Sequence, residues 1–219
     1  MSLVVRNLAE QLVDVVRDRI LTGVVAPDRP IRQDALAAEL GVSKIPLREA
    51  LARLEQEGLL VSQANRGFTV RPLNAAEAEE VYALRLKLEP ETTALAARLA
   101  SPADQARAAG FIDQIDTMTD PLGDGVGAFN RAFHLALLRP ANQPVTFTML
   151  ERLHVLSERY VRKHLEPLGR NERANDEHRE LLDAWLARDE HRVAALTEVH
   201  IGETLDDLRL QLATDHKTF

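Results

Sequence analysis

From Asn74 to Leu212 the sequence carries one helical pattern after another, and no segment there alternates apolar and polar residues as a strand does. Turn residues and prolines, Pro90 among them, divide this stretch into about six or seven helices. Amphipathic helices in succession fold into an antiparallel bundle, because each helix must bury its apolar stripe against its neighbours. The pattern therefore predicts an all-α unit over residues 74–219.

The N-terminal part of the chain follows a different pattern. Apolar spacing predicts a helix over about residues 5–22, then a short second helix, then a third helix capped by Ser43. Two short β-like runs follow, on either side of a polar turn at residues 63–67. Three helices and a hairpin in this order predict a winged helix–turn–helix. The expected fold class is therefore mainly α, with one domain over residues 1–73 and an all-α antiparallel bundle over residues 74–219.

Composition excludes several classes of protein. The 219 residues include no cysteine, which excludes disulfides, iron–sulfur clusters, thiolate zinc sites and a cysteine nucleophile. No apolar run approaches the ~18–20 residues that cross a bilayer, and the start lacks the pattern of a signal peptide. We therefore expect a cytoplasmic chain without a membrane partner.

The net charge of −7 is unevenly distributed, since residues 1–73 carry a net charge of +1 and the remaining residues a net charge of −8. Nucleic-acid binding would require the basic residues of the first part to share one face.

The third predicted helix carries candidate DNA-reading residues. A tight turn before it would let this helix enter a major groove with Ser43, Lys44 and Arg48 toward the DNA. Arg48 can donate two hydrogen bonds to a guanine edge, and Lys44 suits guanine or phosphate. Arg66, beside Gly67 at the hairpin tip, can reach the minor groove or the backbone. Taken alone, Lys44 and Arg48 are also typical of a solvated helix face, and the order of the elements favours the DNA interpretation.

The run from Gln33 to Leu59 contains Ser-x-x-Pro-Leu-Arg-Glu-Ala-Leu followed by Leu-x-x-Glu-Gly-Leu. It resembles the N-terminal domain of the GntR family of bacterial transcription regulators. The resemblance implies that lysine at position 44 replaces a frequent arginine, which keeps the charge but loses bidentate geometry. Arg32, just before the second helix, is a candidate for a backbone contact. The positions that the resemblance assigns to the recognition helix and the wing tip are Ser43, Lys44, Arg48, Arg66 and Gly67.

Seven histidines offer candidate metal ligands. Asn130 and His134 lie four residues apart and share one helical face, while His178 and His200 lie on two later helices beside apolar residues. Three imidazoles and an amide oxygen that converge in a bundle would suit Zn²⁺, Ni²⁺, Mn²⁺ or Fe²⁺. The same spacing fits semi-buried histidines with ordinary hydrogen bonds. The other histidines lie among charged or terminal residues and are expected to be exposed: His154, His164, His191 and His216.

The second half, about residues 77–213, looks like the all-helical FCD ligand-binding domain of the FadR subgroup of this family. That domain carries Asp or Asn, a His four residues later, and a further His on each of the last two helices. The resemblance implies a divalent metal ion, in the first place Zn²⁺, and a small organic acid whose carboxylate completes the coordination. Four neutral ligands would leave the ion its full charge of +2, which attracts an anion. The positions that match in order are Asn130, His134, His178 and His200.

Arg85 is a further candidate for an effector contact. It matches the arginine of the subgroup's Arg-x-x-Leu-Glu pattern with an offset, and its guanidinium can pair with a carboxylate through two hydrogen bonds. The alternative is a surface salt bridge to Glu89, four residues further along the same helix. The spacing of the two residues fits both interpretations.

Together these patterns predict a ligand-responsive regulator that binds a pseudo-palindromic DNA operator as a homodimer. One short recognition helix reads few bases, and a two-fold dimer reads a palindrome. A metal-dependent enzyme built on the histidine-rich bundle is the alternative from another class, because an open coordination position also serves catalysis. We do not expect an enzyme, since no second carboxylate is placed as a base. A structural DNA-binding protein with a metal-stabilised bundle and no effector is the third candidate.

Overall fold

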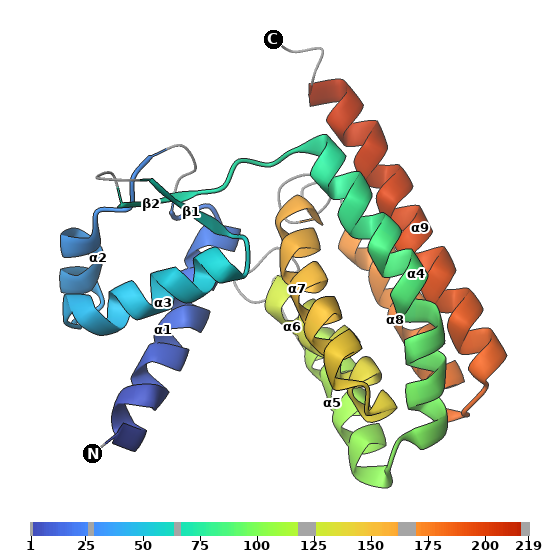
Figure 1. Ribbon diagram of the computed structural model, residues 1–219. Helices are drawn as coiled ribbons and strands as arrows, with labels where there is room; N and C mark the ends of the chain where they lie inside the picture. Colours follow the sequence, from blue (N-terminus) through green and yellow to red (C-terminus); the bar gives the residue numbers. More distant parts are fainter. Residues whose placement is uncertain (1, 26–28, 64–66, 118–125, 162–169, 216–219) are drawn as a thin grey trace. The chain divides into compact units, whose positions relative to one another are not determined.

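The computed structural model describes residues 2–25, 29–63, 67–117, 126–161 and 170–215 (Figure 1). The chain divides into two compact units, Met1–Leu73 and Asn74–Phe219. The helices and strands, in chain order, are α1 (Ser2–Leu21), α2 (Gln33–Glu39), α3 (Lys44–Gln56), β1 (Leu60–Gln63), β2 (Gly67–Val70), α4 (Ala75–Leu99), α5 (Pro102–Thr117), α6 (Val126–Leu138), the 3-10 helix η1 (Arg139–Ala141), α7 (Pro144–Tyr160), α8 (Arg170–Leu186) and α9 (Glu190–Asp215).

The first unit is built around α3, which packs against α1, α2 and β1. Gly41 lies between α2 and α3 at a φ of +66°, a left-handed conformation that glycine adopts without steric cost. The N–H of Val42 donates to the carbonyl of Ala37 at 3.0 Å, which ends α2 and turns the chain into α3. β1 and β2 form an antiparallel hairpin. The buried core of this unit includes Val16, Leu47, Leu51, Leu54 and Leu59.

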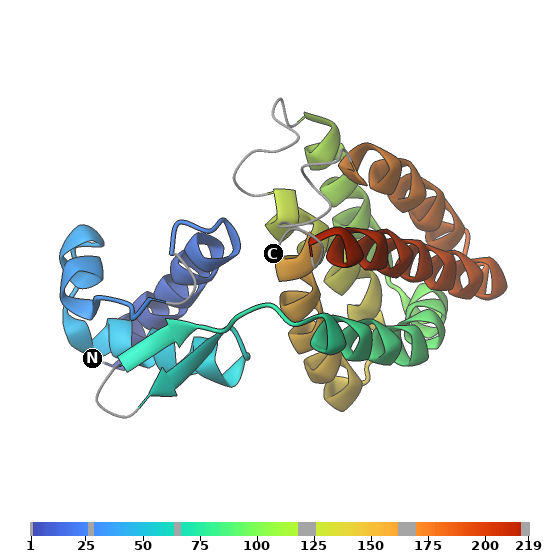
Figure 2. The same ribbon diagram turned by 90° about the horizontal axis from the view of Figure 1, so that it is seen from above.

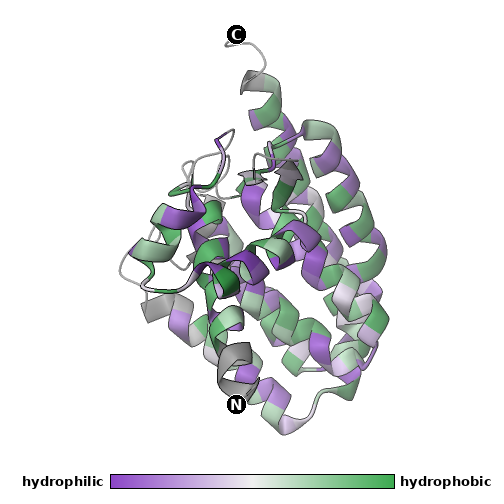
Figure 3. Cartoon of the chain, turned by 60° about the vertical axis from the view of Figure 1, so that its left-hand side comes forward, coloured by the Kyte–Doolittle hydropathy of each residue, from purple (hydrophilic) through white to green (hydrophobic). Residues whose placement is uncertain are grey.

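The second unit is a helical bundle whose longest helices, α4 and α9, lie side by side (Figures 1 and 2). α4 also contacts α6, α7 and α8, so it lies against several of the other helices. In Figure 3 hydrophobic and hydrophilic residues follow one another along each helix, as expected for amphipathic helices. Among the described residues, no helix is long and apolar enough to span a bilayer. One cluster of the buried core includes Phe133, Leu137, Leu181, Trp185 and Val193.

Pro90 does not end a helix, contrary to the sequence prediction. α4 continues through it from Ala75 to Leu99, and Pro90 itself is buried. A proline inside a helix removes one hydrogen bond and crowds the preceding turn. The packing of α4 against α7 and α9 is sufficient to keep the helix continuous.

Asn74 begins the second unit and is fixed in two ways. Its side-chain Oδ1 accepts a hydrogen bond from the N–H of Ala76 at 2.8 Å and so caps α4. The hydroxyl of Tyr160, a buried residue at the end of α7, donates to the carbonyl of Asn74 at 3.0 Å. The same hydroxyl accepts from the N–H of Asn74 at 3.3 Å. The backbone at the start of the second unit is therefore held by the last residue of α7.

Candidate metal centre and nucleic-acid interface

Three of the four predicted metal ligands converge in the second unit. His134 on α6, His178 on α8 and His200 on α9 each offer a ring nitrogen, and these nitrogens lie within 4.8 Å of one another. His134 and His178 are buried, and the side chain of His200 is 11% exposed. A tetrahedral zinc ion with Zn–N bonds of about 2.0–2.1 Å holds its ligand atoms about 3.4 Å apart. Small shifts of the rings would therefore let all three histidines bind one ion.

Asn130 lies one helical turn before His134 on α6. Its side-chain Oδ1 is buried and has no hydrogen-bond partner in the described part of the chain. An unsatisfied buried acceptor costs about 1–3 kcal/mol, and so it fits a site that receives a cation. The donor set of three imidazoles and one amide oxygen is neutral and suits a divalent transition metal.

Glu177 lies within hydrogen-bond distance of His200, one of the candidate metal ligands. Its Oε2 lies 2.6 Å from Nδ1 of His200, and a carboxylate can only accept, so Nδ1 carries the proton. Nε2 of His200 is thereby the nitrogen that remains for a metal, and the carboxylate fixes the orientation of the ring. Glu177 was not among the residues predicted from the sequence, although it directly precedes the predicted ligand His178.

The pKa of His134 is well below its ordinary value of 6.5, because burial disfavours the charged ring and because His178 and His200 lie close by. His134 is therefore neutral near pH 7. A metal ligand must be neutral imidazole, so the environment of His134 favours the protonation state that coordination needs.

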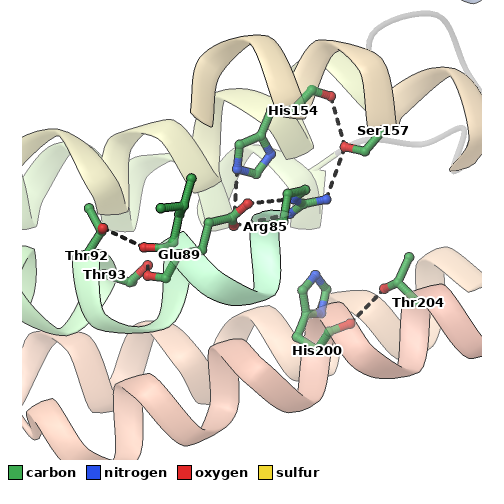
Figure 4. A network of polar contacts seen from close by, with 9 residues as sticks. Arg85, Glu89, Thr92, Thr93, His154, Ser157, His200 and Thr204 are labelled. Carbon is green, nitrogen blue, oxygen red and sulfur yellow. Dashed lines mark hydrogen bonds and ion pairs between the residues drawn. The ribbon is translucent and has the colours of Figure 1, made fainter. Parts of the chain in front are cut away.

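Arg85 lies buried on α4 and is paired with Glu89 (Figure 4). Its Nε donates to Oε1 of Glu89 at 2.5 Å, and its Nη2 donates to Oε2 at 3.2 Å. Its Nη1 donates to the hydroxyl of Ser157 on α7 at 3.0 Å. Of the two interpretations left open for Arg85, the pairing with Glu89 is present in the structure. It is not the surface salt bridge that the sequence suggested, because both side chains point into the bundle.

His154 is buried, which contradicts the sequence prediction of an exposed side chain. Its Nε2 lies 3.3 Å from Oε2 of Glu89, and its ring stacks on that of His134 with centroids 5.3 Å apart. The prediction failed because it judged His154 by its charged neighbours in sequence, and two of these neighbours, Glu158 and Arg159, are buried as well. His191 is exposed as predicted, and His164 and His216 lie outside the described residues.

Burial alone raises the pKa of Glu89, but the nearby guanidinium of Arg85 and the ring of His154 hold that pKa well below its usual range. Burial lowers the pKa of His154, while Glu89 opposes this shift. Glu89 is therefore ionised at neutral pH, and it compensates the buried charge of Arg85. This network connects α4 and α7 beside the three converging histidines.

The predicted DNA-reading residues lie on the outer side of the first unit. Ser43 occupies the N-cap position of α3 in an extended conformation and is exposed, and its side chain makes no capping hydrogen bond. Lys44 is exposed and forms an ion pair with Asp34 of α2, and Arg48 is exposed one turn further on. Arg32 is exposed just before α2 and lines a surface hollow together with Lys44.

The wing tip is described in part. Gly67 begins β2 at a φ of +77°, and a Cβ placed there would lie 3.3 Å from the side-chain nitrogen of Gln33. Glycine suits both the backbone conformation and this close approach. Arg66 lies outside the described residues.

Two family models match the chain in the order of the two units. Residues 8–70 match the model described as bacterial regulatory proteins, gntR family, and residues 80–203 match the FCD domain. The predicted fold class, a winged helix–turn–helix with an all-α second part, is confirmed. In fold, the chain is similar to the structure of McbR/YncC from Escherichia coli, with a TM-score of 0.79 at 24% identity over 94% of this chain and 98% of that one.

Relatives with similar sequences are regulators as well. The uncharacterized HTH-type transcriptional regulator BphR of Paraburkholderia xenovorans (strain LB400) is 31% identical over 94% of this chain and 86% of its own length. The Nta operon transcriptional regulator of Aminobacter aminovorans is 29% identical over 83% of this chain and 85% of its own length. These relatives set aside the alternative of a metal-dependent enzyme. The chain therefore belongs to the GntR family of bacterial transcriptional regulators, in the group whose second domain is an FCD domain.

Proposed function

We propose that the chain binds a pseudo-palindromic operator as a homodimer and that a small organic acid, bound at a metal ion in the FCD domain, changes its affinity for DNA. The observation that carries this proposal is the convergence of the histidine nitrogens with an unsatisfied amide oxygen beside them. A chain that reads a bacterial operator acts in the cytoplasm. The proposed test distinguishes this function from the third candidate, a structural DNA-binding protein without an effector.

The metal ion would be held by Asn130, His134, His178 and His200. Zn²⁺ is the first candidate, and Ni²⁺, Mn²⁺ and Fe²⁺ accept the same donors. When bound, the ion supplies positive charge and open coordination positions, which suit a carboxylate. Arg85 is the proposed second partner of that carboxylate. Because its guanidinium is already paired with Glu89, an effector that reaches Arg85 must share it or displace Glu89.

The test combines metal loading with operator binding. The full-length protein, loaded with one equivalent of Zn²⁺, is mixed with a panel of small mono- and dicarboxylates, and its affinity for an operator selected from random duplexes is measured at constant zinc content. We expect at least one acid to shift the affinity, and the mass of the complex to show two chains per duplex. If no acid in the panel changes the affinity, the candidate without an effector is favoured. A complex with one chain per duplex refutes the homodimer.

In the first unit, Arg48→Ala is expected to weaken operator binding by about 1–3 kcal/mol and to relax specificity at one base per half-site. Lys44→Ala is expected to weaken binding and, where it meets phosphate, to reduce the salt slope by about one. Fluorescence anisotropy at several salt concentrations measures both effects. Arg53→Ala is the matched control, because Arg53 is an exposed arginine on another face of the same helix. Unchanged affinity in both Arg48→Ala and Lys44→Ala refutes the recognition-helix assignment.

In the second unit, Asn130→Asp is expected to tighten metal binding by on the order of tenfold or more, because a negative ligand replaces a neutral one. The same change lowers the positive charge of the site, so it is expected to weaken an anionic effector. Competition with a chromophoric chelator measures the metal affinity. The control is Asn142→Asp, which adds the same charge at an exposed position outside the site. Equal metal affinity in Asn130→Asp and wild type excludes Asn130 as a ligand.

A further inference from the structure

The leading turn of α3 carries an apolar side chain that the core does not use. Ile45, the second residue of α3, is 73% exposed, whereas Pro46 and Leu47 directly after it are buried. Single exposed apolar residues are common on protein surfaces and by themselves indicate no ligand. The position of Ile45 is what gives it meaning, because this turn is the part of the helix that approaches base edges.

The neighbours of Ile45 on this turn are polar and charged. Lys44 precedes it, and Arg48 and Glu49 follow at three and four residues, on the same exposed face. Each of these side chains can exchange hydrogen bonds with phosphates or base edges. Ile45 cannot, because its side chain has no donor or acceptor. Among the groups that base pairs present in the major groove, the apolar one is the 5-methyl group of thymine.

The side chain of Ile45 also suits such a contact in its shape. A β-branched residue has one strongly preferred χ1 rotamer in a helix, so little conformational freedom is lost when it is held against a base. Burial of a methyl group against it removes apolar surface from water on both sides of the contact.

We propose that Ile45 determines specificity by contacting the 5-methyl group of one thymine in each half-site, next to the base pair that Arg48 contacts. The proposal rests on the proposed DNA binding and names a base that this recognition helix selects. In this arrangement Ile45 recognises an apolar group of the DNA. Lys44 and Arg48, on either side of it in the sequence, recognise charged and hydrogen-bonding groups.

The test replaces thymine by deoxyuridine, which removes the 5-methyl group and leaves the pairing edge unchanged. An operator is first enriched from random duplexes with the full-length protein, and each thymine of one half-site is then replaced in turn. For the wild type, one replacement is expected to lower the affinity about fourfold, the value for one apolar carbon withdrawn from water. For Ile45→Ala the same replacement is expected to change the affinity less than about 1.5-fold. Ile45→Val, which keeps an apolar branched side chain, is expected to retain most of the difference.

Arg48→Ala serves as the matched control, because it lowers the affinity but is expected to keep the fourfold ratio between thymine and deoxyuridine. Thermal unfolding of Ile45→Ala, expected to be unchanged since the residue is exposed, checks that the fold is intact. The proposal is overturned if the enriched half-sites contain no thymine, or if the deoxyuridine penalty is equal in wild type and Ile45→Ala. If no sequence is enriched at all, the proposed operator binding fails as well, and this result differs from the other two.

Discussion

Replacing both His178 and His200 by alanine is expected to abolish stoichiometric metal binding. The two changes remove half of the four proposed protein ligands. Even the loss of a residue that only hydrogen-bonds to a metal ligand lowers the affinity for the metal about 10–100-fold. Metal content after dialysis against one equivalent of Zn²⁺, measured by mass spectrometry, gives the result. Zinc at 100 times its dissociation constant would stabilise the wild type by about 2.7 kcal/mol, so the double variant is also expected to lose the zinc-dependent rise in Tm.

The control for this prediction is His191→Ala, because His191 is an exposed histidine outside the cluster. It is expected to bind zinc as the wild type does. A double variant that still holds one zinc per chain would show that the ion is bound elsewhere.

The pH dependence of metal binding follows from His134. Its pKa in the folded chain lies well below 6.5, so protons do not compete with the metal at this residue until the pH falls below the ordinary histidine range. Without metal, the unfolded chain takes up a proton at this position more readily than the folded chain. The contribution of neutral His134 to stability is therefore present above about pH 6.5 and is lost as the pH falls.

Glu89→Ala is expected to lower the free energy of unfolding by about 3–5 kcal/mol. The change leaves the buried guanidinium of Arg85 without its carboxylate, and an uncompensated buried charge carries this cost. For a chain of this size the effect corresponds to a fall in Tm of roughly 6–20 °C. Urea unfolding of the metal-free protein, followed by circular dichroism, measures it without interference from metal binding.

Glu79→Ala provides the comparison within the same unit. Glu79 also pairs with an arginine through two hydrogen bonds, but both Glu79 and Arg209 are exposed to solvent. Its loss is expected to cost less than about 1 kcal/mol. Equal losses of unfolding free energy in Glu89→Ala and Glu79→Ala would show that burial does not control the strength of the Arg85–Glu89 pair.

The stability that Glu89 contributes depends on pH. Because the pKa of Glu89 is lowered in the folded state, this contribution is present above the unfolded pKa of about 4.5 and is lost as the pH falls.

The fold followed from the sequence wherever local chemistry decides the structure. The helical period of the second half, the turn at Gly41 and the cap at Asn74 each state a local preference, and the chain adopts it. Pro90 is the exception. Its local preference is to stop a helix, and the long-range packing of α4 overrides that preference.

The candidate metal site could be predicted from the sequence only in part. The spacing of Asn130 and His134 places them on one face, but no periodicity shows that His178 and His200 lie opposite that face. The resemblance to the FCD domain supplied the grouping, and the three histidines do converge. Glu177 and the inward orientation of His154 were not predicted, because each depends on how far a helix is rotated about its axis in the bundle.

The two hydrogen bonds between Tyr160 and Asn74 have a mechanical consequence. The chain leaves the FCD domain toward the DNA-binding unit at a backbone position that is tied to the end of α7, and α7 also carries Ser157, the partner of Arg85. Asn74 is also the first residue of the second unit, so the boundary between the two units lies directly at this anchored residue. A displacement of the end of α7 would therefore act on the backbone at this boundary without passing through any other helix of the bundle.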